Sequence, residues 1–439
     1  ADAYKRLNDR DKYIEYAQRY VDTINRIIAQ NGDYTDQQRG LAAFYQGEIL
    51  FSEEKFKEAY ASYEAASQLV TEPYRLADIY IIMAEYQATA GNIDQAETLA
   101  VKSADLLTGD VWKARQVGGL LVRLGKRSKA NLYLEKALEL SFSVQERAYS
   151  TAALADACLA WREIPRFLDY ADESTALVKM HRDQFTEAQE GLAAFFQGEI
   201  YHYPGDGRRA YQQYEQATKL LDDRFKRSEA WMRMADIKAV AGEMEEAAAL
   251  ADKSADELRD QGWKMRLVGN FFMRFGLYGK AEDYYQRYVR MSAPDDPLLY
   301  HSILADAYKD ANRQEPYIRA AGEYIKAATA GGRAPTGEEA GLMAYYQGEI
   351  DFYRHETEKA NEAYERAAPL LTDKKRRAEA LMRLARFQAE QGNAENAAEL
   401  AVKAGETFPE ADTLRQAGAL LVELGQADKV YALFERYAE

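Results

Sequence analysis

Apolar residues recur every three or four positions along nearly the whole chain, and short polar turns interrupt this pattern. Such spacing places the apolar side chains on one face of an α-helix. The interruptions carry glycine, for example at 90–92, 124–126 and 241–243, and glycine tolerates the backbone conformations of tight turns. The pattern therefore predicts an all-α chain of short helices joined by tight turns.

Long segments of the sequence recur with a period of about 150 residues. One motif is found three times, as GLAAFYQGEI from Gly40, GLAAFFQGEI from Gly191 and GLMAYYQGEI from Gly341. A second motif follows it in each copy, as WKARQVGGLLVRLG from Trp112, WKMRLVGNFFMRFG from Trp263 and DTLRQAGALLVELG from Asp412. Repetition of this kind indicates a repeat architecture. We expect a partial repeat and seam at 1–39, followed by three units at 40–190, 191–340 and 341–439.

Each unit divides again into shorter repeats, which begin at 40, 77, 111 and 148 in the first unit. Small side chains let two packed helices approach closely. Aromatic residues nearby, such as Tyr63, Tyr214 and Tyr364, would fill the space beside them. The small residues recur in register, at Gly47, Ala84 and Gly118, at Ala59, Ala96 and Ala130, and at Ala66, Ser103 and Ala137.

A helix–turn–helix unit of about 34 residues with this register resembles the tetratricopeptide repeat (TPR). The resemblance extends over essentially the whole chain, as eleven full repeats and a half repeat. It implies a right-handed α-α superhelical solenoid of TPR helix pairs. The chain departs from the family pattern at position 4, where Ala43, Ala194 and Ala344 replace the usual Trp. The Pro that the family carries at position 32 is also mostly absent.

The fourth repeat of each unit is the least regular and is followed by a polar stretch, at 31–39, 181–190 and 331–339. We expect the seams between units there, as short connections rather than flexible linkers. Ala1 aligns with the middle of a helix, and the last helix has no polar capping helix after it. Because the ends of a solenoid need a polar outer face, we expect an excised segment, or ends that pack on something else or on other copies.

Composition and charge narrow the functional classes. The net charge is −15, which disfavours nucleic acid and anionic membrane surfaces as ligands. No run of 18 apolar residues is present, so no membrane insertion is expected. Four histidines, one cysteine and the absence of known catalytic motifs predict no enzyme activity, no cofactor and no metal site. We interpret Cys158, which stands where Tyr4 and Tyr308 lie in the other units, as a packing residue.

The TPR resemblance implies that the first helix of each repeat lines a concave groove through its positions 2, 5, 9 and 12. In the first repeat of each unit these positions read Leu41, Phe44, Glu48 and Phe51, then Leu192, Phe195, Glu199 and His202, then Leu342, Tyr345, Glu349 and Phe352. In the third repeat, positions 2 and 5 read Trp112 and Arg115, Trp263 and Arg266, Asp412 and Arg415. Apart from the three leucines and Asp412, we expect these residues to form a partner-binding groove.

An alternative is that these residues recur only because the units were duplicated, and that their rings pack between repeats. The arginines would then pair with carboxylates such as Glu85 or Asp236. The chain's 32 tyrosines favour some exposed rings, since tyrosine offers both area and a hydroxyl. A chaperone-tail clamp is disfavoured, because Glu48, Glu199 and Glu349 stand where that TPR class carries an Asn.

We expect a non-enzymatic scaffold that binds a protein or peptide, preferably a basic one, along an acidic, aromatic-bearing concave surface. The alternative is a periplasmic scaffold of a bacterial outer-membrane exopolysaccharide export system, which would contact a cationic or neutral polysaccharide or its modifying enzymes. This alternative rests on fold analogy. The compartment stays open between periplasm and cytoplasm, and self-assembly through the ends is a third possibility.

Overall fold

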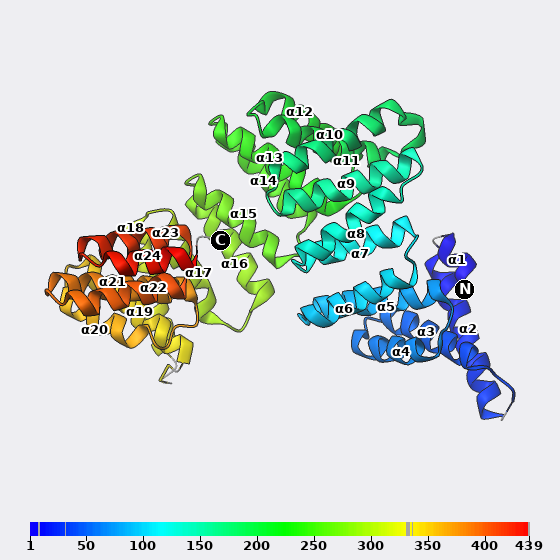
Figure 1. Ribbon diagram of the computed structural model, residues 1–439, viewed down its shortest axis with the longest axis horizontal. Coiled ribbons are helices and arrows are strands. Elements are labelled where there is room, and N and C mark those ends of the chain that lie inside the picture. The colour runs from blue at the N-terminus through cyan, green and yellow to red at the C-terminus, as the bar shows by residue number, and fades with distance from the viewer. Residues whose placement is uncertain (8, 31, 331–333, 336, 438–439) are drawn as a thin grey trace. The chain divides into compact units, whose positions relative to one another are not determined.

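The computed structural model describes residues 1–7, 9–30, 32–330, 334–335 and 337–437 (Figure 1). Over these residues the chain forms 24 α-helices, one short 3-10 helix and no β-strand. It divides into two compact units, 1–237 and 238–439, with the boundary inside α13 (Arg224–Val240). The all-α solenoid expected from the apolar spacing is confirmed.

The first compact unit holds the helices up to α13. Their bounds are α1 (Asp2–Arg6), α2 (Arg10–Ala29), α3 (Asp36–Ser52), α4 (Phe56–Leu69), α5 (Pro73–Thr89), α6 (Ile93–Leu106), α7 (Val111–Arg123), α8 (Arg127–Glu139), α9 (Val144–Ala160), α10 (Ile164–Met180), the 3-10 helix η1 (Arg182–Gln184), α11 (Glu187–His202) and α12 (Gly207–Leu220).

The second compact unit holds the remaining helices. Their bounds are α14 (Met244–Glu257), α15 (Gly262–Arg274), α16 (Tyr278–Ser292), α17 (Pro297–Asp310), α18 (Gln314–Thr329), α19 (Gly337–Tyr353), α20 (Thr357–Ala367), α21 (Lys374–Glu390), α22 (Ala394–Thr407), α23 (Ala411–Glu423) and α24 (Ala427–Arg436).

Within each unit the helices pack in sequence order. An odd-numbered helix packs on the even-numbered helix that follows it, as in α3 with α4 and α19 with α20. The even-numbered helix then contacts the next odd-numbered one, as in α4 with α5 and α20 with α21. Contact with near neighbours along the chain is the signature of a helical repeat array. The TPR register, the number of repeats and the three-unit division at 40–190, 191–340 and 341–439 stay predictions.

Glycine shapes the array in two ways. Gly91 and Gly125 adopt φ values of 80° and 70° in the turns between paired helices, a region in which residues with a Cβ are strained. Inside the helix pairs, a Cβ added at Gly198 would lie 2.5 Å from the ring of Tyr214, and one at Gly47 would lie 2.7 Å from Tyr63. The predicted close approach of helices at small residues, with an aromatic ring beside them, is confirmed.

The predicted seams are short connections that lead directly into helices. At the first two, Thr35 and Thr186 form capping boxes with Gln38 and Gln189 at the starts of α3 and α11, which satisfies backbone N–H groups that the helix leaves unpaired. The third seam includes 331–333 and 336, which lie outside the described residues, and α19 begins within this seam, at Gly337. The first two seams therefore lead into the next helices of the array.

The described residues carry no sign of a membrane-spanning or metal-binding element. None of their helices combines the length and apolar character that crossing a bilayer requires. They also contain no group of three or more His, Cys, Asp or Glu side chains placed to hold a metal ion.

Candidate functional site

The recurring glutamates of the QGEI motif lie inside the array. Glu199 on α11 has no exposed surface. Its Oε1 accepts hydrogen bonds from the hydroxyl of Tyr214 at 2.6 Å and from Nε of Arg233 at 2.7 Å, and its Oε2 accepts one from Nη2 of the same arginine at 3.1 Å. The pair is bidentate, the strongest arrangement of guanidinium and carboxylate. Glu199 therefore holds α11, α12 and α13 together.

Glu349 on α19 occupies the same place in the next copy and is 1% exposed. It accepts hydrogen bonds from the hydroxyls of Tyr317 at 3.0 Å and Tyr364 at 2.7 Å. Two cations flank it, with Nζ of Lys309 at 3.0 Å and Nε of Arg383 at 3.4 Å. Burial raises the pKa of this carboxyl, but the two cations outweigh burial and hold the pKa below its ordinary value.

Glu48 on α3 is half-buried. It accepts hydrogen bonds from the hydroxyls of Tyr13 at 2.7 Å and Tyr63 at 2.8 Å. Ile82 stands where the other copies carry Arg233 and Arg383, so no guanidinium reaches Glu48 from that position. The three glutamates thus share a tyrosine on the following helix and differ in their cations.

The first predicted ring of each copy is also in the core. Phe44, Phe195 and Tyr345 are at most 1% exposed. Cations of the chain itself lie over their faces, with the Arg75 guanidinium 4.6 Å from the Phe44 centroid, Lys226 Nζ 4.7 Å from that of Phe195 and Lys309 Nζ 5.0 Å from that of Tyr345. These rings present no surface to a ligand in this structure.

Two of these cations, Arg75 and Lys226, and a third cation, Arg376, form ion pairs that pass across an intervening helix. Arg75 on α5 pairs with Asp2 on α1, across α3. Lys226 on α13 pairs with Asp156 on α9 at 2.7 Å, across α11. In the second unit Arg376 on α21 pairs with Asp306 on α17, across α19. We call these three pairs the seam clamps, because each spans one predicted seam.

The second predicted ring of each copy is more accessible. Phe51 is 50% exposed and packs edge-on against Phe56. Phe352 is 38% exposed and lies 3.8 Å beneath the guanidinium of Arg383. His202 is half-buried and meets the ring of Tyr214. In the first repeat of each copy, the exposed members of the predicted groove, Phe51 and Phe352, are therefore found at position 12.

The third repeats present different surroundings to their Trp and Arg residues. Trp112 and Trp263 are 55% and 50% exposed. Arg115 is half-buried, with its guanidinium 5.0 Å from the centroid of Tyr149, whereas Arg266 is exposed. Arg415 is exposed and pairs with Asp412. Glu85, one carboxylate considered as a partner for these arginines, pairs instead with Arg123.

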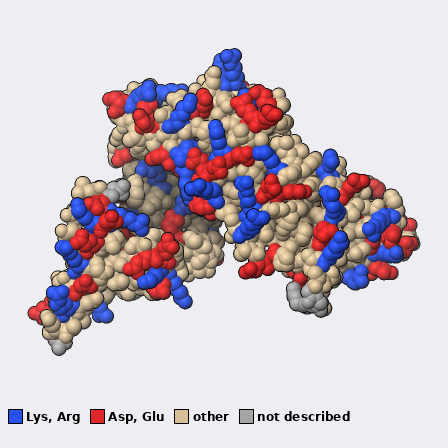
Figure 2. Space-filling view, turned by 180° about the vertical axis from the view of Figure 1, so that it is seen from behind, with Lys and Arg blue, Asp and Glu red and all other residues tan. Residues whose placement is uncertain are grey.

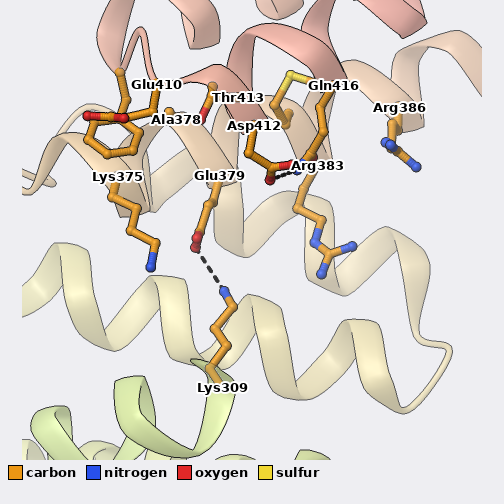
Figure 3. Close-up of a pocket in the computed structure, with 12 residues that line it drawn as sticks. Lys309, Lys375, Ala378, Glu379, Arg383, Arg386, Glu410, Asp412, Thr413 and Gln416 are labelled. Atoms are coloured by element: carbon orange, nitrogen blue, oxygen red, sulfur yellow. Dashed lines mark hydrogen bonds and ion pairs between the residues drawn. The ribbon is translucent and has the colours of Figure 1, made fainter. Parts of the chain in front are cut away.

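A pocket of ≈360 Å³ lies between α17, α21 and α23 in the second compact unit (Figure 3). Its floor is apolar, formed by Ala378, Met382 and Phe408. Its charged lining consists of four cations and three carboxylates, namely Lys309, Lys375, Arg383, Arg386, Glu379, Glu410 and Asp412. We call it the α21 pocket, since most of these residues come from that helix.

Charges in the α21 pocket are only partly satisfied by the protein. Figure 3 shows Lys309 directed towards Glu379, and this pair is 2.8 Å long. Among the described residues, the side chains of Arg386 and Glu410 have no ion-pair or hydrogen-bond partner. Both are exposed. They are the groups of this pocket most available to a ligand.

Sequence reasoning missed Lys375, Arg386 and Glu410. A signal was present, because α21 carries six cations and two carboxylates in a chain of net charge −15. The negative net charge of the whole chain did not indicate this local excess of cations. Figure 2 shows basic and acidic side chains interspersed over the face in view, rather than a continuous acidic surface.

The lone cysteine offers no reactive thiol. Cys158 is fully buried. Burial raises the pKa of its thiol to about 11, so the thiolate that acts as a nucleophile is scarce at neutral pH. The interpretation of Cys158 as a packing residue is confirmed.

Comparison with known proteins adds no family name. No family model and no curated protein matches the chain. Among solved structures it is similar to yeast Tom70, with 15% identity, a TM-score of 0.38 and 91% of each chain covered. It is also similar to a chain of Naa15/Naa10 bound to HypK-THB, with 16% identity, a TM-score of 0.31 and 98% of this chain and 66% of that chain covered. For BtubC from P. vanneervenii the identity is 16%, the TM-score 0.34, and the coverage 57% of this chain and 91% of that chain.

Proposed function

We propose that this chain is a non-enzymatic scaffold of the TPR type, and that its α21 pocket binds a segment of a protein or peptide partner. The observation that carries the proposal is that Arg386 and Glu410, whose side chains have no partner among the described residues, line a pocket together with the apolar residues Ala378, Met382 and Phe408. Charges and apolar area side by side are what a peptide segment uses for register and affinity. No arrangement of nucleophile and base accompanies them.

The pocket supports a partner segment that carries both signs of charge. Arg386 would accept a carboxylate and Glu410 an ammonium or guanidinium group, while Met382 and Phe408 pack against an apolar side chain. The basic partner expected from the net charge stays a prediction for the chain as a whole. Four cations against three carboxylates in the lining do not by themselves favour a purely basic ligand.

Panning a random peptide display library against the intact chain tests this function. We expect enriched peptides with a carboxylate and a basic residue flanking an apolar one. Arg386→Glu should weaken the enriched peptides more than tenfold, since hydrogen bonds to charged groups contribute about 1.5–3 kcal/mol. Arg366→Glu, an exposed position on α20, is the matched control. If the enriched peptides bind Arg386→Glu and Glu410→Lys as tightly as the wild type, the pocket assignment is refuted.

The exopolysaccharide scaffold remains the second candidate, and the exposed tryptophans favour it. Trp112 and Trp263 each leave half or more of their surface in solvent, and exposed rings pack well on the apolar faces of sugars. Titration with a partly deacetylated, cationic glycan should then change tryptophan fluorescence in the wild type and not in Trp112→Ala/Trp263→Ala. An unchanged signal at millimolar glycan would exclude this role for the two rings.

A further inference from the structure

Arg115 on α7 is a half-buried cation that the protein does not pair. Its Nη1 has almost no accessible surface and no hydrogen-bond partner among the described residues. Among the described residues no ion pair involves its guanidinium, which lies over the face of Tyr149 on α9, 5.0 Å from the ring centroid. Partly buried charges without a partner are costly. An unpaired guanidinium here therefore requires an explanation.

Three other half-buried arginines of the chain are compensated, whereas Arg377 on α21, like Arg115, has a buried nitrogen without a hydrogen-bond partner among the described residues. Arg233 is held by Glu199, Arg383 by Glu349 and Arg376 by Asp306. Burial lowers the pKa of Arg115, whereas nearby carboxylates raise the pKa of Arg233 in spite of burial. Arg115 thus differs from these three in having no carboxylate in ion-pair contact among the described residues.

The carboxylates nearest to Arg115 are engaged elsewhere. Asp110 caps α7 by accepting a hydrogen bond from the backbone N–H of Lys113 at 2.7 Å. Glu146 completes the capping box of α9 and accepts from the N–H groups of Phe142 and Ser143, both at 3.0 Å. Each stabilises a helix start in its present position. Both carboxylates raise the pKa of Arg115 through space, but neither forms an ion pair or hydrogen bond with its guanidinium.

Two exposed apolar rings lie at the starts of the same two helices. Trp112, one helical turn before Arg115, is 55% exposed. Phe142, directly before the N-cap of α9, is 93% exposed and shares the Glu146 carboxylate. Rings this exposed commonly mark an interaction surface when they adjoin a specific polar group. The starts of α7 and α9 therefore carry one planar, half-buried cation and two exposed apolar rings.

We infer that Arg115 binds a carboxylate of an acidic peptide segment whose neighbouring apolar side chain packs on Trp112 and Phe142. The ligand carboxylate would reach the exposed edge of the guanidinium and supply the missing charge, while the Tyr149 face keeps the plane oriented. Charge complementarity selects a carboxylate, and the two exposed rings select a peptide with an apolar side chain. This site lies in the first compact unit and is independent of the α21 pocket.

The test uses the intact chain and two small probes, a blocked Glu-Leu-Glu peptide and digalacturonate. We expect the peptide to bind saturably, with a change in the fluorescence of Trp112 that Trp112→Phe removes. Arg115→Gln should weaken binding about tenfold or more, because one charge-assisted contact is lost. Arg115→Lys should weaken it less, since the charge stays and the planar fork is lost. Arg147→Gln, which removes an exposed arginine paired with Glu173, should bind as the wild type does.

A thermal unfolding series separates binding from a structural role. Arg115→Met removes an uncompensated charge and keeps an apolar stem on Tyr149, so we expect an equal or higher unfolding midpoint. A lower midpoint with unchanged peptide binding would overturn the inference, because the guanidinium would then serve the fold. Absence of saturable peptide binding would overturn it as well. If digalacturonate binds as tightly as the peptide, and if this binding also depends on Arg115, the ligand of the site is an acidic polysaccharide and the peptide assignment is overturned.

Discussion

Glu199 and Glu349 occupy the same place in two copies of one motif, yet they depend on different cations. Glu199 relies on Arg233, and Glu349 has both Lys309 and Arg383. Removing one partner of a buried pair leaves an uncompensated charge, which costs about 3–5 kcal/mol. The copies should therefore respond unequally to the loss of the equivalent arginine.

Arg233→Met should destabilise the chain more than Arg383→Met does. Among the described residues, the first change leaves Glu199 with the Tyr214 hydroxyl as its one side-chain partner, whereas Lys309 still neutralises Glu349 after the second. Urea unfolding followed by circular dichroism measures the difference in midpoint. Arg209→Met, which breaks an exposed pair with Asp206, should cost less than about 1 kcal/mol. Equal losses from Arg233→Met and Arg383→Met would contradict this reading.

The lowered pKa of Glu349 predicts how stability depends on pH. A carboxyl whose pKa is lower in the folded chain stabilises it above the unfolded value, about 4.3 for Glu, and this contribution is lost as pH falls through the folded pKa. Glu349→Gln should therefore unfold at a lower temperature than the wild type at pH 7, with a gap that narrows in acid. Thermal scans from neutral to acid pH measure this gap. A constant gap would show that ionisation of Glu349 is not involved.

At the scale of helices, the array is determined by how closely paired helices approach. Gly118 and Gly119 are neighbours on α7 and differ sharply in surroundings. A Cβ at Gly118 would lie 2.6 Å from Leu134, which is fully buried on α8, whereas one at Gly119 would meet nothing within 4 Å. Substitutions at these two glycines therefore distinguish the effect of packing between helices from the effect of helix propensity.

Gly118→Ala should destabilise the chain, and Gly119→Ala should stabilise it. Overpacking a tight core costs about 1–3 kcal/mol, and replacing glycine by alanine in a helix recovers at most about 1 kcal/mol. Gly119→Ala gains this stabilisation from helix propensity without any cost of overpacking. Thermal midpoints of the two variants, measured side by side, check the opposite signs. Stabilisation by both would mean that α7 and α8 can separate at little cost.

At the scale of the whole molecule, each compact unit contains its own long-range ties. The seam clamps Asp2–Arg75 and Asp156–Lys226 lie in the first unit, and Asp306–Arg376 lies in the second. Each joins helices that are separated by about 70 residues in sequence. In repeat proteins, the stabilising interactions are formed mainly between neighbouring repeats. A mutation should therefore destabilise the helices around it and leave distant helices unaffected.

Hydrogen exchange with mass spectrometry can test this locality. Asp156→Asn should accelerate amide exchange in α9–α12 and leave α17–α24 unchanged. Asp306→Asn should do the reverse, so each variant is the control for the other. Lys226 and Arg376 would each lose the carboxylate that offsets their burial. Loss of protection throughout the chain from either change would contradict the division into two units.

The helix pairs, their turns and the small residues between them could be predicted from sequence, because local spacing and the absence of a Cβ determine them within about 20 residues. The same spacing placed Phe44, Glu199 and Glu349 on the inner side of the first helix of a repeat. It did not reveal that they are enclosed. Enclosure requires Arg75, Arg233 and Arg383, which come from helices 31–34 residues further along the chain.

Sequence by itself thus determined the elements of this protein and their order, since those follow from near-neighbour sterics and apolar periodicity. Tertiary structure alone decided which charged side chains form ion pairs inside the array and which remain available to a partner. Glu199 pairs with Arg233, while Arg115, Arg386 and Glu410 have no ion-pair partner among the described residues. The reason is physical: the state of a charge depends on the groups within a few ångströms, and distant segments supply those groups.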